Sequence, residues 1–535
     1  MIADKVLLSD AVFTGRENFS VPGGVVIKGN RIAALCGKRE AEKYIGRETQ
    51  VFSYGDKLIM PGLCDAHGHF NLGALYRSRY FLREIEHSRS EVECARMVGA
   101  FAQAHPTYKR IIGMGWFPVN WRDASLPTKA SLDALVPDRP VYLAAADLHT
   151  CWMNTKALEE IKVDSEDPKL GKFVGRLKNG ELSGILREGA WFQWACARVL
   201  MPDATIDEEV DTELLKALSA SGITSFCDCS GIMPGTNFDA LKRIERKGKL
   251  TVRVHLNPSV SEDPEQRALL QEEKRYHSDM LRVTGAKGIV DGVTTTYTAY
   301  LLAPYQDRPE TCGTPVNPQQ YYENCVLAAN RHGFGVRLHC IGDAAVRLAL
   351  DCFEKSNAVN DNRNIRNSIE HIESIHLDDI PRFGKLGVVA SMQPRHLPLD
   401  ANEKIARIGQ ERARYEWPNR SVLDGGGMLA FGTDYPVVDF NPFENLYYAL
   451  TRNGYDHRPT GVNPLEKVTL SEALRAYTFG GAYVSGREKE LGTLEPGKLA
   501  DVIVLDRNLF HVDAEEIPDC KVLLTVCDGK IVFER

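Results

Sequence analysis

The sequence predicts an α/β protein whose largest domain is a (β/α)8 TIM barrel, a closed ring of eight parallel strands that alternate with helices. Three observations lead to this expectation. Strand-like and helical stretches alternate through most of the chain, one long segment interrupts the alternation, and both chain ends carry short strand patterns. We therefore expect a barrel over residues 58–486, an inserted region over residues 72–213, and a small β-sandwich domain built from residues 1–57 and 487–535.

Eight strand candidates make up the predicted barrel, and helical stretches such as residues 317–331 and 343–355 separate most of them. Strands that alternate with helices form parallel sheets, and eight such units are the number in a TIM barrel. An open doubly wound sheet is the alternative, but the chain lacks the glycine-rich phosphate turn of that fold. The strand candidates are residues 58–67, 222–227, 252–256, 288–290, 335–339, 367–371, 387–391 and 429–434.

Both chain ends have the pattern of short strands joined by turns. A meander of this kind buries little apolar surface by itself. We therefore expect the two ends to meet in one small β domain. The strand patterns lie at residues 5–13, 24–28, 31–35 and 50–54 near the start, and at residues 501–506, 521–526 and 530–533 near the end.

Residues 72–213 do not follow the alternation and are too long for one crossover. We interpret them as an insertion between the first and second barrel strands that lies over the barrel mouth. This region holds five of the six tryptophans. Aromatic side chains over a barrel mouth suggest the walls of a substrate pocket, and Trp116 and Trp152 are the predicted contacts. The alternative is that the tryptophans fill the small core of the insertion itself.

Composition and charge narrow the classes of protein that fit. A hydrophobic fraction of 43% and a charged fraction of 26% are ordinary for a soluble globular protein, and 535 residues imply two or three domains. A net charge of −7 without a basic block argues against a nucleic-acid partner. We find no run of about 18 apolar residues that could span a membrane and no signal-peptide pattern, so we expect no membrane partner. The expected partner is a small-molecule substrate.

Cysteine usage predicts a cytoplasmic location. The thirteen cysteines are an odd number without a repeating spacing, which is typical of reduced thiols. One close pair, Cys227 and Cys229, follows a strand-like run. A metal-ligand pair is one interpretation, but buried thiols at a strand end are favoured because no second pair lies nearby in the sequence.

The clearest chemical motif is His67-Gly68-His69, at the end of the first strand candidate. Side chains two residues apart on a strand point to the same side, so the two imidazoles can bind one metal ion together. Two ordinary polar histidines are the alternative. Later strand candidates carry metal-binding residue types at their ends, where barrel enzymes have their active sites, namely His339, His371 and Asp434. Lys287 lies just before the fourth strand candidate.

With these motifs the chain resembles the amidohydrolase superfamily, specifically the YtcJ-like branch that includes N-substituted formamide deformylases. The similarity runs nearly from end to end and is specific for the family, although it says little about the substrate. The matching motifs lie within residues 61–69, 126–141, 149–158, 184–188, 391–394, 432–437 and 492–501.

The resemblance implies a centre for one or two divalent metal ions. In the family's arrangement one set of side chains binds the more buried ion and a second set binds the other. Imidazole and carboxylate ligands suit zinc best, with iron, manganese or nickel as alternatives. The implied ligands are His67, His69 and Asp434 for the more buried ion, and His339 and His371 for the second.

Lys287 would bridge the two ions as a carbamate. An ammonium group repels a dication, whereas reaction of the lysine with carbon dioxide gives an anion with two oxygens that can span two ions. The alternative is an unmodified Lys287 beside a single metal ion.

The implied roles give a mechanism. A water molecule on a divalent metal has its pKa lowered to about 7, so hydroxide becomes available at neutral pH. Asp434 would take the proton of this water and pass it to the leaving nitrogen. The second metal ion, His149 or His396 would polarise the substrate carbonyl. For both histidines the alternative is an ordinary loop residue, and His149 lies in one of the matching motifs.

One loop departs from the family pattern. Relatives commonly carry a stretch of small residues after Asp291-Gly292, whereas this chain has two tyrosines there. Because this loop should face the substrate, we expect Tyr297 or Tyr300 to contact it, and Arg187 is a further expected contact. A packed loop aromatic is the alternative for each tyrosine.

The leading hypothesis is therefore a metal-dependent hydrolase that cleaves a non-peptide carbon–nitrogen bond in an amide, an N-substituted formamide or a cyclic amide. An aminohydrolase that releases ammonia from a heterocycle is an alternative enzyme. A catalytically inactive metal-binding or regulatory homologue is the alternative outside enzymes. A homodimer is an expectation from the resemblance alone.

Overall fold

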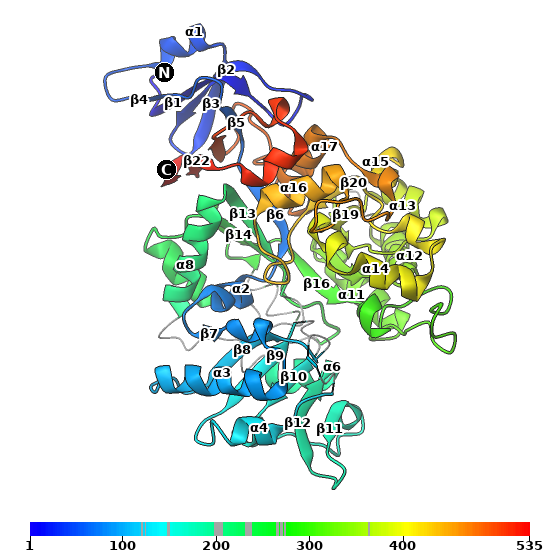
Figure 1. The fold of residues 1–535 in the computed structure, drawn as a ribbon. Coiled ribbons are helices and arrows are strands. Elements are labelled where there is room, and N and C mark those ends of the chain that lie inside the picture. Colours follow the sequence, from blue (N-terminus) through cyan, green and yellow to red (C-terminus); the bar gives the residue numbers. More distant parts are fainter. Residues whose placement is uncertain are drawn as a thin grey trace. The chain divides into compact units, whose positions relative to one another are not determined.

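The computed structural model describes most of the chain and divides it into two compact units (Figure 1). The first unit contains residues 1–69, 215–231 and 244–535, and the second contains residues 70–214 and 232–243. The described residues are 1–118, 121–122, 125–146, 150–196, 207–230, 238–263, 267, 271, 274–361 and 364–535.

Parallel strands form the centre of the first unit. One sheet has the order β15-β14-β13-β6 and the other runs from β16 through β17, β18 and β19 to β20, with parallel pairing throughout. The strands are β6 (Leu63–Gly68), β13 (Ile223–Asp228), β14 (Arg253–Leu256), β15 (Leu281–Val283), β16 (Gly285–Ile289), β17 (Gly335–Cys340), β18 (Ser368–His371), β19 (Val389–Met392) and β20 (Met428–Phe431).

The two sheets connect at both edges. Only Thr284 separates β15 from β16, so these two segments continue one another. At the other edge, Gly68 just inside the end of β6 forms a parallel bridge with Tyr435 beyond β20, and the amide of Thr433 donates to the carbonyl of His67 at 3.1 Å. The pairings therefore form a closed ring of parallel strands, and the predicted α/β class is confirmed.

Helices alternate with these strands because their apolar residues repeat every three or four positions. In α12 (Asp343–Asn360), for example, Ala345, Leu348, Cys352 and Ser356 are buried along one stripe. The other helices that follow one another along this part of the chain are α11 (Gln319–Arg331), α13 (Ile380–Leu386), α14 (Leu397–Ile408), α15 (Asn419–Asp424), α16 (Pro442–Thr451), α17 (Leu470–Arg475) and α18 (Gly481–Val484), and the short α1 (Lys38–Ala41) lies near the start of the chain. Helices α8 (Asp207–Ala220) and α9 (Phe238–Arg246) precede and follow β13 in the chain.

Strands from both chain ends share one eight-stranded sheet, seen as adjacent blue and red arrows in Figure 1. The junction is the antiparallel pair β5–β21, in which Pro61 faces Val502. Its division into two layers, as in a sandwich, stays a prediction. The strands are β1 (Lys5–Val12), β2 (Val21–Lys28), β3 (Arg31–Cys36), β4 (Gln50–Ser53), β5 (Leu58–Pro61), β21 (Val502–Leu505), β22 (Val522–Cys527) and β23 (Lys530–Glu534).

The second unit is built on a six-stranded sheet with the order β11-β12-β10-β9-β8-β7. It includes all of residues 72–213, and the placement of this region over a barrel mouth stays a prediction. Its elements are α2 (Phe70–Arg77), β7 (Phe81–Leu82), α3 (Glu91–Ala104), β8 (Ile111–Trp116), α4 (Lys129–Asp133), β9 (Val141–Ala145), β10 (Thr150–Met153), α5 (Thr155–Ile161), β11 (Val174–Arg176), β12 (Leu182–Arg187) and α6 (Glu188–Ala190).

Three tryptophans fill the core of this second unit. The rings of Trp116, Trp121 and Trp152 lie 5.8 to 6.3 Å apart, and all three side chains are buried. The indole N–H of Trp116 donates to the carbonyl of Leu143, and that of Trp152 donates to the carbonyl of Thr128. Their polar atoms are thus satisfied inside the core. Trp116 and Trp152 were predicted as pocket walls, but their side chains lie in the core of the unit, which was the alternative.

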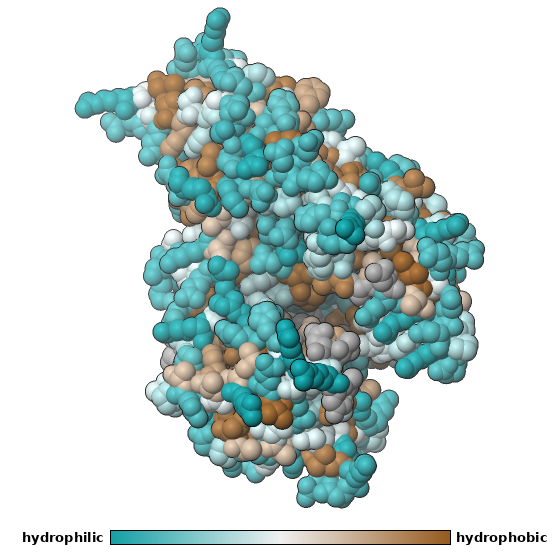
Figure 2. Space-filling view, in the orientation of Figure 1, coloured by the Kyte–Doolittle hydropathy of each residue, from teal (hydrophilic) through white to brown (hydrophobic). Residues whose placement is uncertain are grey.

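The face of the molecule in Figure 2 is mostly hydrophilic, and its hydrophobic residues form small groups among polar ones. Scattered apolar residues of this kind are normal on a protein surface. Within the described ranges, no helix combines the length and the apolar character needed to cross a lipid bilayer.

Candidate metal centre

The ends of β6 and β20 bring two histidines and an aspartate together. The Nε2 atom of His69 lies 2.9 Å from Oδ1 of Asp434, and Nε2 of His67 lies 3.3 Å from the same oxygen. The candidate ligand atoms of these three residues all lie within 4.8 Å of one another. Residues far apart in the sequence meet because the ring closes between these two strands.

The other three predicted groups lie against this cluster. Lys287 in β16 places Nζ at 3.1 Å from Nε2 of His67. The ring of His371 at the end of β18 lies 4.8 Å from that of His67 and 4.5 Å from that of His339 in β17, measured between ring centroids. The structure therefore brings all six predicted groups to one place.

A buried ion pair fixes the orientation of His67. Its Nδ1 lies 2.6 Å from Oε2 of Glu370, and Oε1 of Glu370 accepts a bond from Nε of Arg337 at 3.0 Å. Arg337 also donates to the carbonyl of Ala66, the residue before the histidine. With Nδ1 directed at the carboxylate, Nε2 of His67 faces Asp434 and Lys287. A carboxylate on the far nitrogen is the usual partner of a metal-binding histidine.

Glu370 and Arg337 were missed in the sequence. Each stands inside a strand-like run. Glu370 contacts His67 and Arg337 contacts Ala66, and in both contacts the two residues are more than 270 positions apart in the sequence. The available signal was a charged residue in the middle of a strand that must be buried on both faces, since such a charge needs a partner.

A second buried carboxylate ties β6 to the loop after β20. Asp65 accepts bonds from the amide of Thr433 at 3.0 Å and from its hydroxyl at 2.5 Å. The amide of Asp434 donates to the carbonyl of His67 at 2.6 Å. These contacts hold Asp434 in place against the two histidines, although its φ of 60° lies in the left-handed region.

Local electrostatics favour the ligand forms of these side chains. Burial raises the pKa of Asp434, but His67 and His69 outweigh it and hold the pKa well below its usual range. Burial also raises the pKa of Glu370, but the charges and hydrogen bonds of Arg337 and His67 outweigh this effect. The pKa of Glu370 therefore lies well below its usual value. Burial, with a contribution from His339, holds the pKa of His371 well below its ordinary value. The carboxylates are therefore ionised and this imidazole is neutral, as metal binding requires.

The donor set fits a divalent metal ion. The Nδ1 atoms of His69 and His371 are buried, and neither has a hydrogen-bond partner in the described part of the chain. A buried nitrogen without a partner is costly, so a water molecule or an ion is expected beside it. In His69 the nitrogen that faces Asp434 is Nε2, which leaves that atom for the metal ion. Imidazoles with one carboxylate are typical ligands of zinc and of the neighbouring transition metals.

Of the two extra histidines that the sequence proposed, one belongs to this site. Nε2 of buried His396 lies 3.9 Å from Oδ2 of Asp434, and its ring stacks on that of His371 at 6.0 Å. The other, His149, lies outside the described residues.

The proposed substrate contacts are placed as follows. Tyr297 donates its hydroxyl to Asp307 at 2.7 Å and its ring lies under the guanidinium of Arg308, which matches a packed loop aromatic. Tyr300 is partly buried, and its backbone amide donates to buried Asp291 at 2.8 Å. Arg187 is exposed at the end of β12 in the second unit.

A separate group of metal-capable residues lies deeper in the first unit. Cys64, Cys227 and His255 place their ligand atoms within 4.8 Å of one another, and all three side chains are buried. The Nη1 atom of Arg487 lies 3.2 Å from Nε2 of His255, so Nε2 accepts and the proton sits on Nδ1, which faces the sulfur of Cys227 at 3.8 Å. A protonated Nδ1 has no lone pair to offer a metal ion, and hydrogen bonds from Cys64 and His255 hold the pKa of Cys227 below its usual range. Cys229 is also buried, close to His67 and Glu370.

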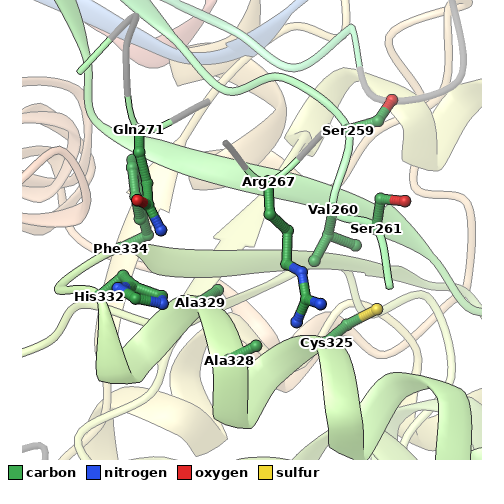
Figure 3. A pocket seen from close by; sticks show the side chains of 10 residues that line it. All are labelled: Ser259, Val260, Ser261, Arg267, Gln271, Cys325, Ala328, Ala329, His332 and Phe334. Carbon is green, nitrogen blue, oxygen red and sulfur yellow. The ribbon is translucent and has the colours of Figure 1, made fainter. Parts of the chain in front are cut away.

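One cavity of the first unit lies away from the metal centre. In Figure 3 the side chains of Arg267, Gln271 and His332 reach toward it from above α11 and from the end of that helix. None of the six metal-site groups lines this cavity.

The chain matches the model of the amidohydrolase family over residues 50–533. It is 29% identical to the protein LONG AFTER FAR-RED 3 of Arabidopsis thaliana, over 100% of this chain and 92% of the relative. It is 26% identical to the putative amidohydrolase YtcJ of Bacillus subtilis, over 93% of each chain. It is 24% identical to the N-substituted formamide deformylase of Arthrobacter pascens, over 99% of this chain and 98% of the relative.

A solved structure shows the same fold. The crystal structure of an uncharacterized metal-dependent hydrolase from Pyrococcus horikoshii superposes with a TM-score of 0.78 at 25% identity, over 96% of this chain and 99% of the other. The resemblance found in the sequence, including its YtcJ-like branch, is therefore confirmed.

Proposed function

The chain belongs to the amidohydrolase family, and we propose that it is an enzyme that hydrolyses a carbon–nitrogen bond in a small amide, an N-substituted formamide or a cyclic amide. The observation that carries the proposal is the meeting of His67, His69 and Asp434 within 4.8 Å, with Lys287, His339 and His371 against them. The relative from Arthrobacter pascens, named as an N-substituted formamide deformylase, supports this substrate class.

The residues that would hold metal are those six, with His67, His69 and Asp434 around one ion and His339 and His371 around a second. A divalent ion at such a site lowers the pKa of water and polarises a carbonyl group. Zinc suits the donor set best, and iron, manganese or nickel are alternatives.

Asp434 is the proposed general base and acid. Its Oδ1 faces the two histidines and its Oδ2 faces His396, so one oxygen is oriented while the other is turned toward a second polar group. Asp434 takes a proton from the attacking water and passes it to the nitrogen that leaves. His396, whose Nε2 lies 3.9 Å from Oδ2 of Asp434, is proposed to donate a hydrogen bond to the substrate's carbonyl oxygen as negative charge develops there.

Lys287 is proposed to act as a carbamate. Its Nζ lies 3.1 Å from Nε2 of His67, so an ammonium there would face a nitrogen that is proposed to bind a cation. The carbamate replaces that positive charge with an anion. An unmodified lysine beside one metal ion is the alternative.

The test is a panel of substrates given to metal-loaded protein: N-substituted formamides, N-acyl amino acids, cyclic imides and amino-substituted heterocycles. We expect amine release, or ring opening for imides, from at least one of the first three groups, and a much slower reaction with Asp434→Asn. Release of ammonia from a heterocycle alone would replace the proposal with the aminohydrolase. A metal-loaded wild type that hydrolyses none of these compounds would favour an inactive homologue.

A further inference from the structure

One buried amide at the end of a ring strand has no partner. Gln393 follows β19 directly and exposes only 1% of its surface. Neither Nε2 nor Oε1 of its side chain has a hydrogen-bond partner within the described ranges. A buried carboxamide that makes no hydrogen bond destabilises the folded state, so its presence calls for a ligand that satisfies it.

A nearby buried side-chain amide, that of Asn445, has all its hydrogen-bonding atoms paired within the protein. Asn445 in α16 is equally buried, but its Nδ2 donates to the carbonyl of Gly432 and to the hydroxyl of Tyr477. Its Oδ1 accepts from the amide of Arg395 at 2.8 Å. The paired amide of Asn445 and the unpaired amide of Gln393 lie close together in the fold, because Asn445 accepts from Arg395, which is two residues from Gln393.

The strand geometry directs the Gln393 side chain toward the inside of the ring. Ser391 faces the inside, because its hydroxyl lies 3.5 Å from the same Nη2 of Arg337 that contacts Glu370. The φ of Gln393 is −121°, as in a strand, and its ψ of 87° turns only the backbone that follows, so the alternation of β19 continues to this side chain. Its side chain therefore points to the same side as Ser391, one step nearer to the carboxyl end of the strand.

That step places Gln393 on the rim that carries the metal-site residues. Its carbonyl accepts the amide of His396 at 2.9 Å, in the short helical turn Pro394–His396. His396 in turn lies 3.9 Å from Asp434. Gln393 and the proposed general base thus belong to connected loops at the same end of the ring.

We propose that Gln393 binds the substrate and selects amides that retain an N–H. A carboxamide offers one acceptor and one donor side by side, so its oxygen can accept an N–H while its nitrogen donates. Oε1 accepts the substrate's N–H. In a cyclic amide or imide, whose N–H and C=O lie on the same side, Nε2 also donates to the neighbouring carbonyl oxygen. This inference rests on the proposed function, because it specifies the substrate class of the same site. The competing explanation is that enclosed water molecules satisfy the amide permanently.

The first test measures stability without any substrate. In metal-loaded protein we expect Gln393→Leu to unfold at the same temperature as wild type or higher, because the change removes an unsatisfied amide and keeps an apolar volume. Asn445→Leu is the matched control and should unfold at a clearly lower temperature, because it leaves its partners without a bond. A drop for Gln393→Leu as large as that of the control would overturn the proposal.

The second test measures recognition of the N–H with a metal-chelating probe. Acetohydroxamate keeps an N–H, and N-methylacetohydroxamate lacks it. By calorimetry with metal-loaded protein, we expect wild type to prefer acetohydroxamate at least tenfold and Gln393→Leu to lose that preference. An equal preference in the two proteins, or no binding of either probe to wild type, would contradict the proposal.

Failure of this inference can be told apart from failure of the proposed function, because neither test requires turnover. If an active substrate is found, Gln393→Leu should lower kcat/KM at least tenfold for an N-monosubstituted formamide. The loss should be smaller for an N,N-disubstituted one. Equal losses for the two compounds would count against recognition of the N–H.

Discussion

The tryptophan core of the second unit and the rim of the strand ring in the first unit are both buried and both rich in side chains that form hydrogen bonds. In the tryptophan core, the N–H groups of Trp116 and Trp152 donate to backbone carbonyls. On the rim, Nδ1 of His69, Nδ1 of His371 and the side-chain amide of Gln393 have no partner among the described residues. The difference separates a region made for packing from one made to bind something else.

The largest effect is expected at the rim, from Asp434→Asn. The amide keeps the shape of the carboxylate but cannot take a proton, so turnover of an identified substrate should fall about 10²–10⁴-fold. Most of the metal should remain bound and the unfolding temperature should change little. Steady-state kinetics with metal analysis of the same sample checks this, and near-normal activity would show that another group carries the proton.

In the tryptophan core the largest effect should be on stability instead. Trp152→Ala removes a fully buried ring and should cost about 3–5 kcal/mol in the free energy of unfolding. Chemical denaturation measures it, with Trp194→Ala as control, since Trp194 is only partly buried. Unchanged metal content is expected in both variants. Loss of substrate binding without loss of stability in Trp152→Ala would restore the role of pocket wall.

Lys287→Ala tests the carbamate. We expect activity to fall about 10²-fold, together with partial recovery when acetate or propionate is added, because a short carboxylate can replace the missing anion. Asp434→Asn is the control and should show no recovery. Full activity of Lys287→Ala, without any added acid, would favour a centre that does not use the lysine.

A smaller effect is expected at Glu370, which contacts the proposed metal ligand His67 but is not itself a proposed ligand. Glu370→Gln keeps the side-chain shape but removes the charge that orients His67, so metal affinity should fall about 10–100-fold. Competition with a chelator measures this affinity. Ser391→Ala, which touches Arg337 but not His67, should bind metal like wild type. Equal affinity in all three proteins would limit Glu370 to a structural role.

Much of the rim could be predicted from the sequence, because its signal is local. The motif at His67 and His69 needs only the alternation of a strand, and His339 and His371 lie at strand ends that apolar runs mark clearly. Glu370, Arg337 and Gln393 could not be assigned this way. Their roles depend on which strands become neighbours, and that register joins residues hundreds of positions apart.

For the tryptophans, the sequence pattern was visible but their role could not be predicted from it. Aromatic density in residues 72–213 was visible, but pocket walls and a hydrophobic core use the same residue types. Only the backbone carbonyls that accept from Trp116 and Trp152 distinguish the two, and those partners follow from how β8, β9 and β10 pack. The ring closure that ties Thr433 to Asp65 depends on tertiary contacts in the same way.

The most direct test of the account is the metal content of the purified chain, measured by inductively coupled plasma mass spectrometry for wild type and for His67→Ala combined with His69→Ala. We predict one to two equivalents of a divalent transition metal in wild type, removable by a chelator, and a loss of at least one equivalent in the double variant. A wild type that binds no metal after loading, or a double variant that binds as much as wild type, would contradict it.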